Sequence, residues 1–158
     1  MKNNNTFKLT VSGMVIALYV VIMYFTQSFS FGQYQIRLAT SLYSLTALFP
    51  FLILPLGVSN FLSNTIMGGL GPIDMIGGAL VGLLTSGTVY LIKKYKFNDW
   101  FIMLPLIFGP GLLVPIWLSL LLKLPYLALA ISLCIGQVIP AILGAILVKQ
   151  LRKFNLYK

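Results

Sequence analysis

Phe31-Gly32-Gln33-Tyr34-Gln35-Ile36-Arg37-Leu38-Ala39-Thr40-Ser41-Leu42 is a polar interruption in an otherwise apolar chain. Two glutamines, an arginine, a threonine and a serine fall within it, whereas the runs on either side are almost wholly apolar. Such side chains are costly in hydrocarbon unless they pair with each other, with water or with a ligand. We therefore expect them to line a binding site at one membrane surface, closed over by the other helices.

The composition identifies lipid as the solvent of the fold. The chain has 158 residues, of which 59% are hydrophobic and only 8% are charged, against about 25% charged residues in soluble domains. We expect a single transmembrane domain over residues 1–158. With one cysteine and no histidine, an internal disulfide and a histidine-based metal site are excluded. The net charge of +9 comes from basic residues at the ends of apolar runs, which indicates topology signals rather than nucleic-acid binding.

The apolar runs predict an all-α integral membrane protein with about six transmembrane helices, since one span needs about 20 residues. Pro50, Pro55 and Gly57 interrupt the second run, which predicts two short broken helices joined by a tight turn. Prolines and glycines between Pro105 and Pro115 predict either a discontinuous fifth helix or packing kinks. The expected helices cover residues 7–25, 38–54, 56–68, 73–92, 101–122 and 126–148.

The distribution of basic residues predicts the orientation. With six spans and a cytoplasmic N-terminus, nine basic residues lie inside and two, Arg37 and Lys123, lie outside. The nine are Lys2, Lys8, Lys93, Lys94, Lys96, Lys149, Arg152, Lys153 and Lys158. A single span over residues 38–67 remains the alternative, with eight inside, three outside and the N-terminus translocated.

The six-span arrangement brings polar residues from separate segments to the outer end. The amides of Gln33, Gln35, Asn60, Asn64 and Gln137 offer both hydrogen-bond donors and acceptors to a flat polar solute. Three further residues have two interpretations each, because Tyr34 and Trp117 either stack on a ligand or mark the interface, and Arg37 either contacts ligand or snorkels. Asp74 is either a ligand contact or a helix N-cap.

The sequence disfavours catalysis. It has no histidine, its only two acids are Asp74 and Asp99, and no phosphate-binding loop occurs. We expect neither an enzyme nor a cofactor.

Gly13 and Ala17 stand four residues apart and share a helix face, which favours close approach either of another helix of the same bundle or of a partner protein.

The chain resembles the QueT family of queuosine-precursor transporters. The resemblance rests on Gly32-Gln33-Tyr34-Gln35-Ile36-Arg37, the proline-broken hairpin, Asn64, and Gly68-Gly69-Leu70-Gly71-Pro72-Ile73-Asp74. It implies a six-helix substrate-binding S component of an energy-coupling factor (ECF) transporter in the bacterial plasma membrane, with both termini cytoplasmic. Such a subunit binds a 7-deazaguanine in an outward pocket and works with a membrane coupling subunit and two ATPases. Gly13 and Ala17 would dock on the coupling subunit.

Two positions depart from the family pattern. The family has an acid shortly after the arginine, where this chain has Ala39-Thr40-Ser41, and a Gly-Glu pair where it has Gly136-Gln137. An acid suits a cationic aminomethyl group, so the departures at Thr40 and Gln137 favour a neutral deazaguanine or another purine-like base. Two alternatives remain open at this stage: an S component for another water-soluble vitamin, and a small membrane scaffold without a ligand.

Overall fold

The computed structural model describes residues 5–32, 34–68 and 70–153, and every regular element among them is helical. Short 3-10 helices and one π-helix extend or connect the α-helices. The α-helices are α1 (Asn5–Phe25), α2 (Gln27–Ser30), α3 (Ile53–Ser63), α4 (Pro72–Lys94), α5 (Met103–Leu122) and α6 (Tyr126–Lys153). The other elements are the 3-10 helices η1 (Leu38–Ala47), η2 (Pro50–Leu52) and η4 (Asp99–Ile102), and the π-helix η3 (Asn64–Gly68).

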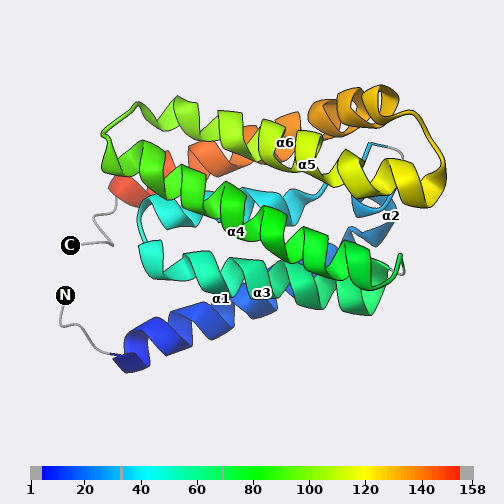
Figure 1. The fold of residues 1–158 in the computed structure, drawn as a ribbon. Helices are drawn as coiled ribbons and strands as arrows, with labels where there is room; N and C mark the ends of the chain where they lie inside the picture. Colours follow the sequence, from blue (N-terminus) through cyan, green and yellow to red (C-terminus); the bar gives the residue numbers. More distant parts are fainter. Residues whose placement is uncertain (1–4, 33, 69, 154–158) are drawn as a thin grey trace.

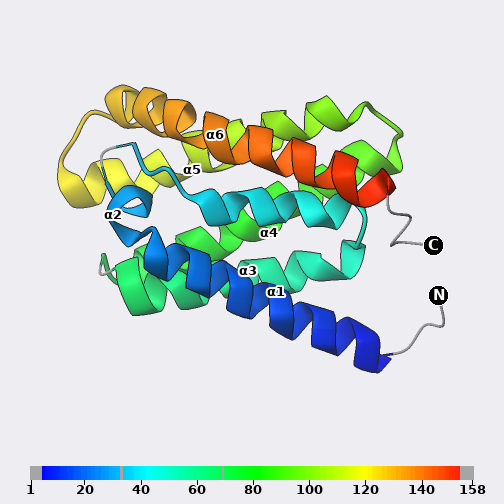
Figure 2. The same ribbon diagram turned by 180° about the vertical axis from the view of Figure 1, so that it is seen from behind.

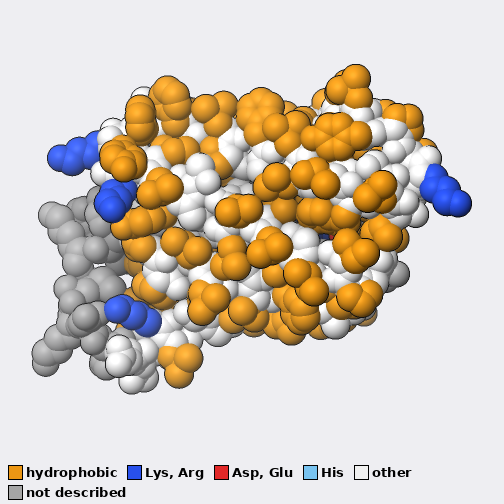
Figure 3. All heavy atoms as spheres, viewed as in Figure 1, with side chains coloured by type: hydrophobic (Ala, Val, Ile, Leu, Met, Phe, Trp, Pro, Cys, Tyr) orange, Lys and Arg blue, Asp and Glu red, His pale blue; other side chains and the backbone are white. Residues whose placement is uncertain are grey.

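Five helical runs in the described residues are long and apolar enough to cross a membrane. They are Asn5–Phe25, Pro50–Gly68, Pro72–Lys94, Asp99–Leu122 and Tyr126–Lys153. These runs lie along one common direction in a single bundle (Figures 1 and 2). Large apolar side chains cover the side of the bundle, while several Lys and Arg side chains lie at one end and a single basic side chain projects from the other (Figure 3). A multi-pass membrane protein is therefore confirmed, and the helices expected at residues 7–25, 73–92, 101–122 and 126–148 each correspond to one of these runs.

The predicted pair of broken helices differs from the structure. The break falls at Leu48 and Phe49 rather than between residues 54 and 56, because a residue that precedes proline is disfavoured in the helical region and Pro50 then opens a new helical run. Pro55 lies in the first turn of α3, where its missing N–H has no helical acceptor to lose. The first of the pair is the ten-residue 3-10 helix η1, so a sixth full span stays a prediction.

The discontinuous form of the fifth helix is wrong. Pro110 and Pro115 both lie inside α5, which runs unbroken from Met103 to Leu122. Both prolines are buried, and Gly111 between them packs against Cys134 of α6. Of the two interpretations of this proline-rich run, only close packing against neighbouring helices survives.

The short helix η1 lies inside the bundle and organises it. It packs against α1, α4 and α6, and in Figure 2 its cyan ribbon runs between α1 and α6. Most of its side chains are buried, including the hydroxyl groups of Thr40, Tyr43, Ser44 and Thr46. Thr46 illustrates how this polarity is satisfied, because its hydroxyl proton is shared between the carbonyl oxygens of Tyr43 and of Ser86 on α4, each 2.8 Å from Oγ1.

Helix α1 is the least enclosed of the five runs. Its buried residues are Val15, Tyr19 and Met23, which recur every four positions and form one narrow stripe. Gly13 and Ala17 lie outside that stripe and are exposed, and a Cβ built on Gly13 would meet nothing within 4 Å. Close packing inside the bundle is therefore excluded as the role of these two small residues.

Candidate substrate-binding site

The segment from Phe31 to Arg37 enters the bundle at the end opposite to the start of α1 and the end of α6 (Figure 2). Gln35 adopts a left-handed backbone conformation with φ of 43°, which a non-glycine residue rarely does and which often marks a functional segment. The segment presses directly on α6 at Gly136, because a Cβ at that position would overlap the carbonyl oxygen of Tyr34. The glycine thus allows the polar segment to lie against the helix that carries the next candidate residue.

Arg37 is a buried cation whose partners are all uncharged. It is 6% exposed, its Nε donates to the carbonyl of Ser30 and its Nη1 donates to Oδ1 of Asn60, both at 3.4 Å. Its guanidinium carbon lies 4.8 Å from the centroid of the Phe31 ring. Both ion pairs found among the described residues belong to Asp99 at the other end, so no carboxylate neutralises this arginine.

From Arg37 a chain of hydrogen bonds crosses the core to α1. Asn60 Nδ2 donates to the Tyr43 hydroxyl at 2.6 Å, and that hydroxyl pairs with the Tyr19 hydroxyl at 3.0 Å. The two tyrosine rings stack with centroids 5.8 Å apart. Polar side chains of α1, η1, α3 and the 31–37 segment therefore form one connected network, and low polarity around it strengthens each bond.

A second polar cluster joins η3, α4 and α5. Asn64 Nδ2 donates to the backbone carbonyl of Asp74, and Trp117 Nε1 donates to Asp74 Oδ1, both at 3.0 Å. Asp74 lies in the first turn of α4, but its carboxylate turns to the indole, and the N-cap residue is Gly71. Of the two interpretations of Asp74, a side-chain N-cap bond is therefore wrong, although its charge still lies near the positive end of the helix dipole.

Glycines of α4 bring this cluster together. A Cβ at Gly78 would collide with the Asn64 amide, and one at Gly77 would lie 2.9 Å from the Trp117 ring. The side chains that reach across from α3, η3 and α5 therefore occupy the space that larger residues on α4 would take. Gly68 is equally confined, since its Cβ would lie 3.2 Å from Asp74 Oδ2.

Two buried amide oxygens of the site have no hydrogen-bond partner within the described residues. Gln137 Nε2 donates to the carbonyl of Gln35 at 2.9 Å, but Gln137 Oε1 has no donor. Asn64 Oδ1 is likewise unpartnered, and each residue is only 1% exposed. Because an unsatisfied buried acceptor costs about 1–3 kcal/mol, these two oxygens are positions where a ligand N–H donor would gain most.

A cavity of about 390 Å³ lies at this end of the bundle, and Gln35 and Gly68 connect its lining to Gln137 and Asn64. Among the described residues, Gln35 is the one polar side chain of the lining, and the apolar wall consists of Phe31, Leu70 and leucines of α5, α6 and the turn between them. The lining residues are Phe31, Gly32, Gln35, Gly68, Leu70, Leu118, Leu122, Leu124, Leu129 and Leu133. A small apolar pocket with a few convergent polar groups is the usual form of a small-molecule site.

The structure gathers most of the predicted site residues at this end of the bundle. Gln35 lines the cavity and accepts from Gln137, while Arg37, Asn60, Asn64, Asp74 and Trp117 form the two clusters described above. Thr40 is buried in the first turn of η1 and does not line the cavity. Tyr34 is 49% exposed and contributes mainly its backbone. Gln33 lies outside the described residues.

Sequence reasoning missed the ring of Phe31, the link from Tyr43 to Tyr19, and the leucine wall. The sequence could have indicated the contact of Phe31 with Arg37, because Phe31 lies only six residues before the arginine in the same segment. The leucines gave none, because a leucine facing a cavity and one facing lipid look alike in a sequence. Within the described residues, no group of three or more His, Cys, Asp or Glu side chains could hold a metal ion.

The exposed side of α1 carries a separate groove of about 540 Å³. It is lined only by apolar residues, and Ala17 is among them. The full lining is Val11, Met14, Val15, Ala17, Leu18 and Val21. Gly13 lies on the same exposed side of the helix, so the groove follows the small residues predicted for docking.

Comparison with known proteins gives one match. The family described as QueT transporter matches residues 9–153, nearly the whole chain. No curated protein and no solved structure matches it.

Proposed function

The chain belongs to the QueT transporter family, and on this premise we propose that it is the S component of an ECF-type micronutrient importer. In this role it binds solute in the membrane, while a coupling subunit and two ATPases supply the driving force. The sequence supports this division of work, since it contains no phosphate-binding loop. The exposed small-residue side of α1, with Gly13 and Ala17, is the surface proposed to meet the coupling subunit.

The proposed ligand is a queuosine precursor or a related 7-deazaguanine. The observation that carries this is a set of unmatched polar groups directly behind the cavity lining: the unneutralised Arg37 and the unpartnered oxygens of Asn64 and Gln137. Arg37 lies over the ring of the lining residue Phe31, Asn64 lies next to Gly68, and Gln137 is hydrogen-bonded to Gln35. A deazaguanine presents one ring carbonyl and several N–H groups on a flat bicycle. Its carbonyl would accept from the guanidinium, its N–H groups would donate to the two amide oxygens, and its ring faces would pack on Phe31 and the leucines.

The substituent on the five-membered ring is proposed to be neutral. Thr40 and Gln137 occupy the two positions where the family pattern has acids, and the one acid at this end, Asp74, does not line the cavity and turns its Oδ1 to the Trp117 indole. A cationic aminomethyl group in the cavity would therefore add a second buried cation near Arg37 without a carboxylate in the cavity lining. The cyano-deazaguanine avoids that cost.

The proposed orientation places the site toward the outside. The end of the bundle that carries Lys93, Lys94, Lys96 and Arg152 is cytoplasmic by the positive-inside rule, and η1 counts as the sixth, shortened span. Both termini are then cytoplasmic and the cavity opens at the outer surface.

The test is the thermal stability of the purified protein in detergent against 7-deazaguanines, guanine, queuine and water-soluble vitamins. A ligand that binds only the folded state adds about 2.7 kcal/mol at a hundredfold excess over Kd. We expect the cyano-deazaguanine to give the largest shift. Asn64→Ala should reduce that shift, while the neighbouring exposed Thr65→Ala should keep it.

The other outcomes each reject a defined part of the proposal. A shift with an unrelated vitamin alone would keep the S-component role and reject the deazaguanine. No shift with any compound, in a sample that unfolds cooperatively, would reject solute binding and favour a membrane scaffold. An equal loss of the ligand shift in Asn64→Ala and Thr65→Ala would reject the assignment of the site.

A further inference from the structure

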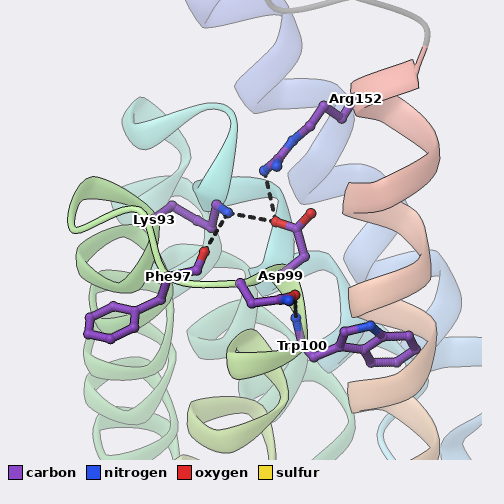
Figure 4. Close-up of polar contacts among 6 residues, drawn as sticks. Lys93, Phe97, Asp99, Trp100 and Arg152 are labelled. Carbon is purple, nitrogen blue, oxygen red and sulfur yellow. Dashed lines mark hydrogen bonds and ion pairs between the residues drawn. The ribbon is translucent and has the colours of Figure 1, made fainter.

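The basic end of the bundle contains a charged cluster that the transport site does not use. Asp99, at the start of η4, accepts at the same Oδ1 from Lys93 Nζ at 2.6 Å and from Arg152 Nη2 at 2.8 Å (Figure 4). Lys93 also donates to the carbonyl of Phe97 at 3.0 Å. The carboxylate therefore fixes the end of α4 and the end of α6 around the loop that connects α4 to α5.

An open groove of about 810 Å³ lies over this cluster. Its lining combines basic side chains with one acid, one amide and one aromatic ring. The lining residues are Lys93, Lys96, Phe97, Asn98, Asp99 and Arg152. Three cations less one carboxylate leave a net charge of +2, so the groove has more positive charge than Asp99 neutralises.

Several donors in the groove remain available to an anion. Within the described residues, Arg152 donates only from Nη2, to Asp99, and neither its Nε and Nη1 nor the side chain of the exposed Lys96 has a partner. Asn98 Oδ1 accepts from the backbone N–H of Trp100 at 3.2 Å, so its Nδ2 is the group left to donate. These groups suit phosphate oxygens, which accept several charge-assisted bonds at once.

An apolar surface adjoins the charged groove. Trp100, Phe101 and Leu104 line a shallow groove of about 210 Å³ at the start of the spanning run of α5. The two grooves meet at an aromatic pair, since the rings of Phe97 and Phe101 have centroids 5.7 Å apart. The charged groove and the exposed apolar groove therefore lie next to each other, one after the other from the end of the bundle toward its middle.

We propose that this composite groove binds one anionic glycerophospholipid. Its phosphodiester lies among Lys93, Lys96 and Arg152, and its acyl chains lie against Trp100 and Phe101. A soluble phosphate compound would use the cations but not the adjoining apolar groove, and a neutral lipid would leave the net charge of +2 uncompensated. Basic pockets between helices at a membrane surface are suited to such headgroups.

The experiment measures binding of single lipids to the purified full chain by native mass spectrometry, with thermal stability as a second readout. The probes are phosphatidylglycerol, phosphatidylcholine and soluble glycerol 3-phosphate. The groove variant is K96Q/R152Q. The matched control is K94Q/K149Q, which removes the same charge at the same end from exposed residues that do not line the groove.

We expect phosphatidylglycerol to bind and to stabilise the chain more than phosphatidylcholine does. Because the groove variant lacks two cations, its affinity for phosphatidylglycerol should fall about thirtyfold. The affinity of the control variant should stay within about threefold of the wild-type value. K96Q alone breaks no side-chain bond of the described residues, so a partial loss in that variant would exclude misfolding as the cause.

Three results would overturn the proposal. Equal losses in the groove and control variants would mean only diffuse surface charge. Equal stabilisation by glycerol 3-phosphate and by the lipid would mean a site for a soluble anion. Equal binding of phosphatidylglycerol and phosphatidylcholine would mean that the basic residues of the groove do not distinguish an anionic lipid from a zwitterionic one.

Discussion

Replacing Tyr43 by phenylalanine tests the hydrogen-bond chain that links Arg37 to α1. The Tyr43 hydroxyl is the middle of that chain, with Asn60 Nδ2 at 2.6 Å on one side and the Tyr19 hydroxyl at 3.0 Å on the other. Tyr19 is 0% exposed and Asn60 is 4% exposed, so water cannot replace the lost partner. Removing one oxygen leaves two buried polar groups unsatisfied.

The magnitude follows from counting the groups left without a partner. Tyr19→Phe removes an end of the chain and leaves Tyr43 bonded to Asn60, which should cost about 1 kcal/mol. Tyr43→Phe leaves two groups unpaired and should cost about 2–4 kcal/mol. The double variant leaves only Asn60 Nδ2 unpaired, at about 1–3 kcal/mol. Adding Tyr19→Phe should therefore destabilise the wild-type chain but stabilise the Tyr43→Phe variant.

The assay is reversible unfolding in mixed detergent micelles for the four chains of this double-mutant cycle. A coupling free energy of about 1–2 kcal/mol, with the double variant more stable than Tyr43→Phe, is expected. Additive losses would mean that the two hydroxyls act independently, and the connected network would then be wrong. Tyr90→Phe, in a half-buried tyrosine for which no side-chain bond is found within the described residues, serves as the control for loss of a hydroxyl.

Three further substitutions probe the site itself. Gly136→Ala places a methyl group where it would overlap the Tyr34 carbonyl, so the thermal shift with a deazaguanine should disappear while the chain still folds. A retained shift would show that ligand binding does not need the close approach of the Tyr34 carbonyl to α6. Gln137→Glu should move preference in a competition assay from the cyano to the aminomethyl compound, and unchanged relative affinities would reject the neutral ligand. Trp117→Phe removes the donor to Asp74 and should lower the unfolding free energy by about 1–2 kcal/mol; an unchanged value would mean that the indole bond contributes nothing.

The spans and the gathering of polar residues at one end could be predicted because lipid makes hydropathy decisive. Arg37, Asn60, Asn64 and Gln137 stand out in a chain so apolar, and their burial confirms that they face inward.

The helix breaks were harder to predict from residue types. Pro50 ends one segment, whereas Pro110 lies inside an intact helix. A proline's effect depends on whether neighbouring groups satisfy the carbonyl that it frees, and that is a tertiary property. The partners of Asp74 are also tertiary, since Trp117 lies 43 residues away.

The 3-10 form of η1 determines how deep the proposed binding site would lie in the membrane. Ten residues at about 2.0 Å each make a segment of about 20 Å, whereas the hydrocarbon layer is about 30 Å thick. The proposed orientation puts the basic end of the bundle at one surface of that layer, and η1 ends near it (Figure 1). Arg37, which precedes η1, would then lie roughly 10 Å below the opposite surface. On the proposed outward orientation, a solute bound beside Arg37 would already lie about a third of the way across the hydrocarbon layer, so the remaining barrier would be shorter than the membrane itself.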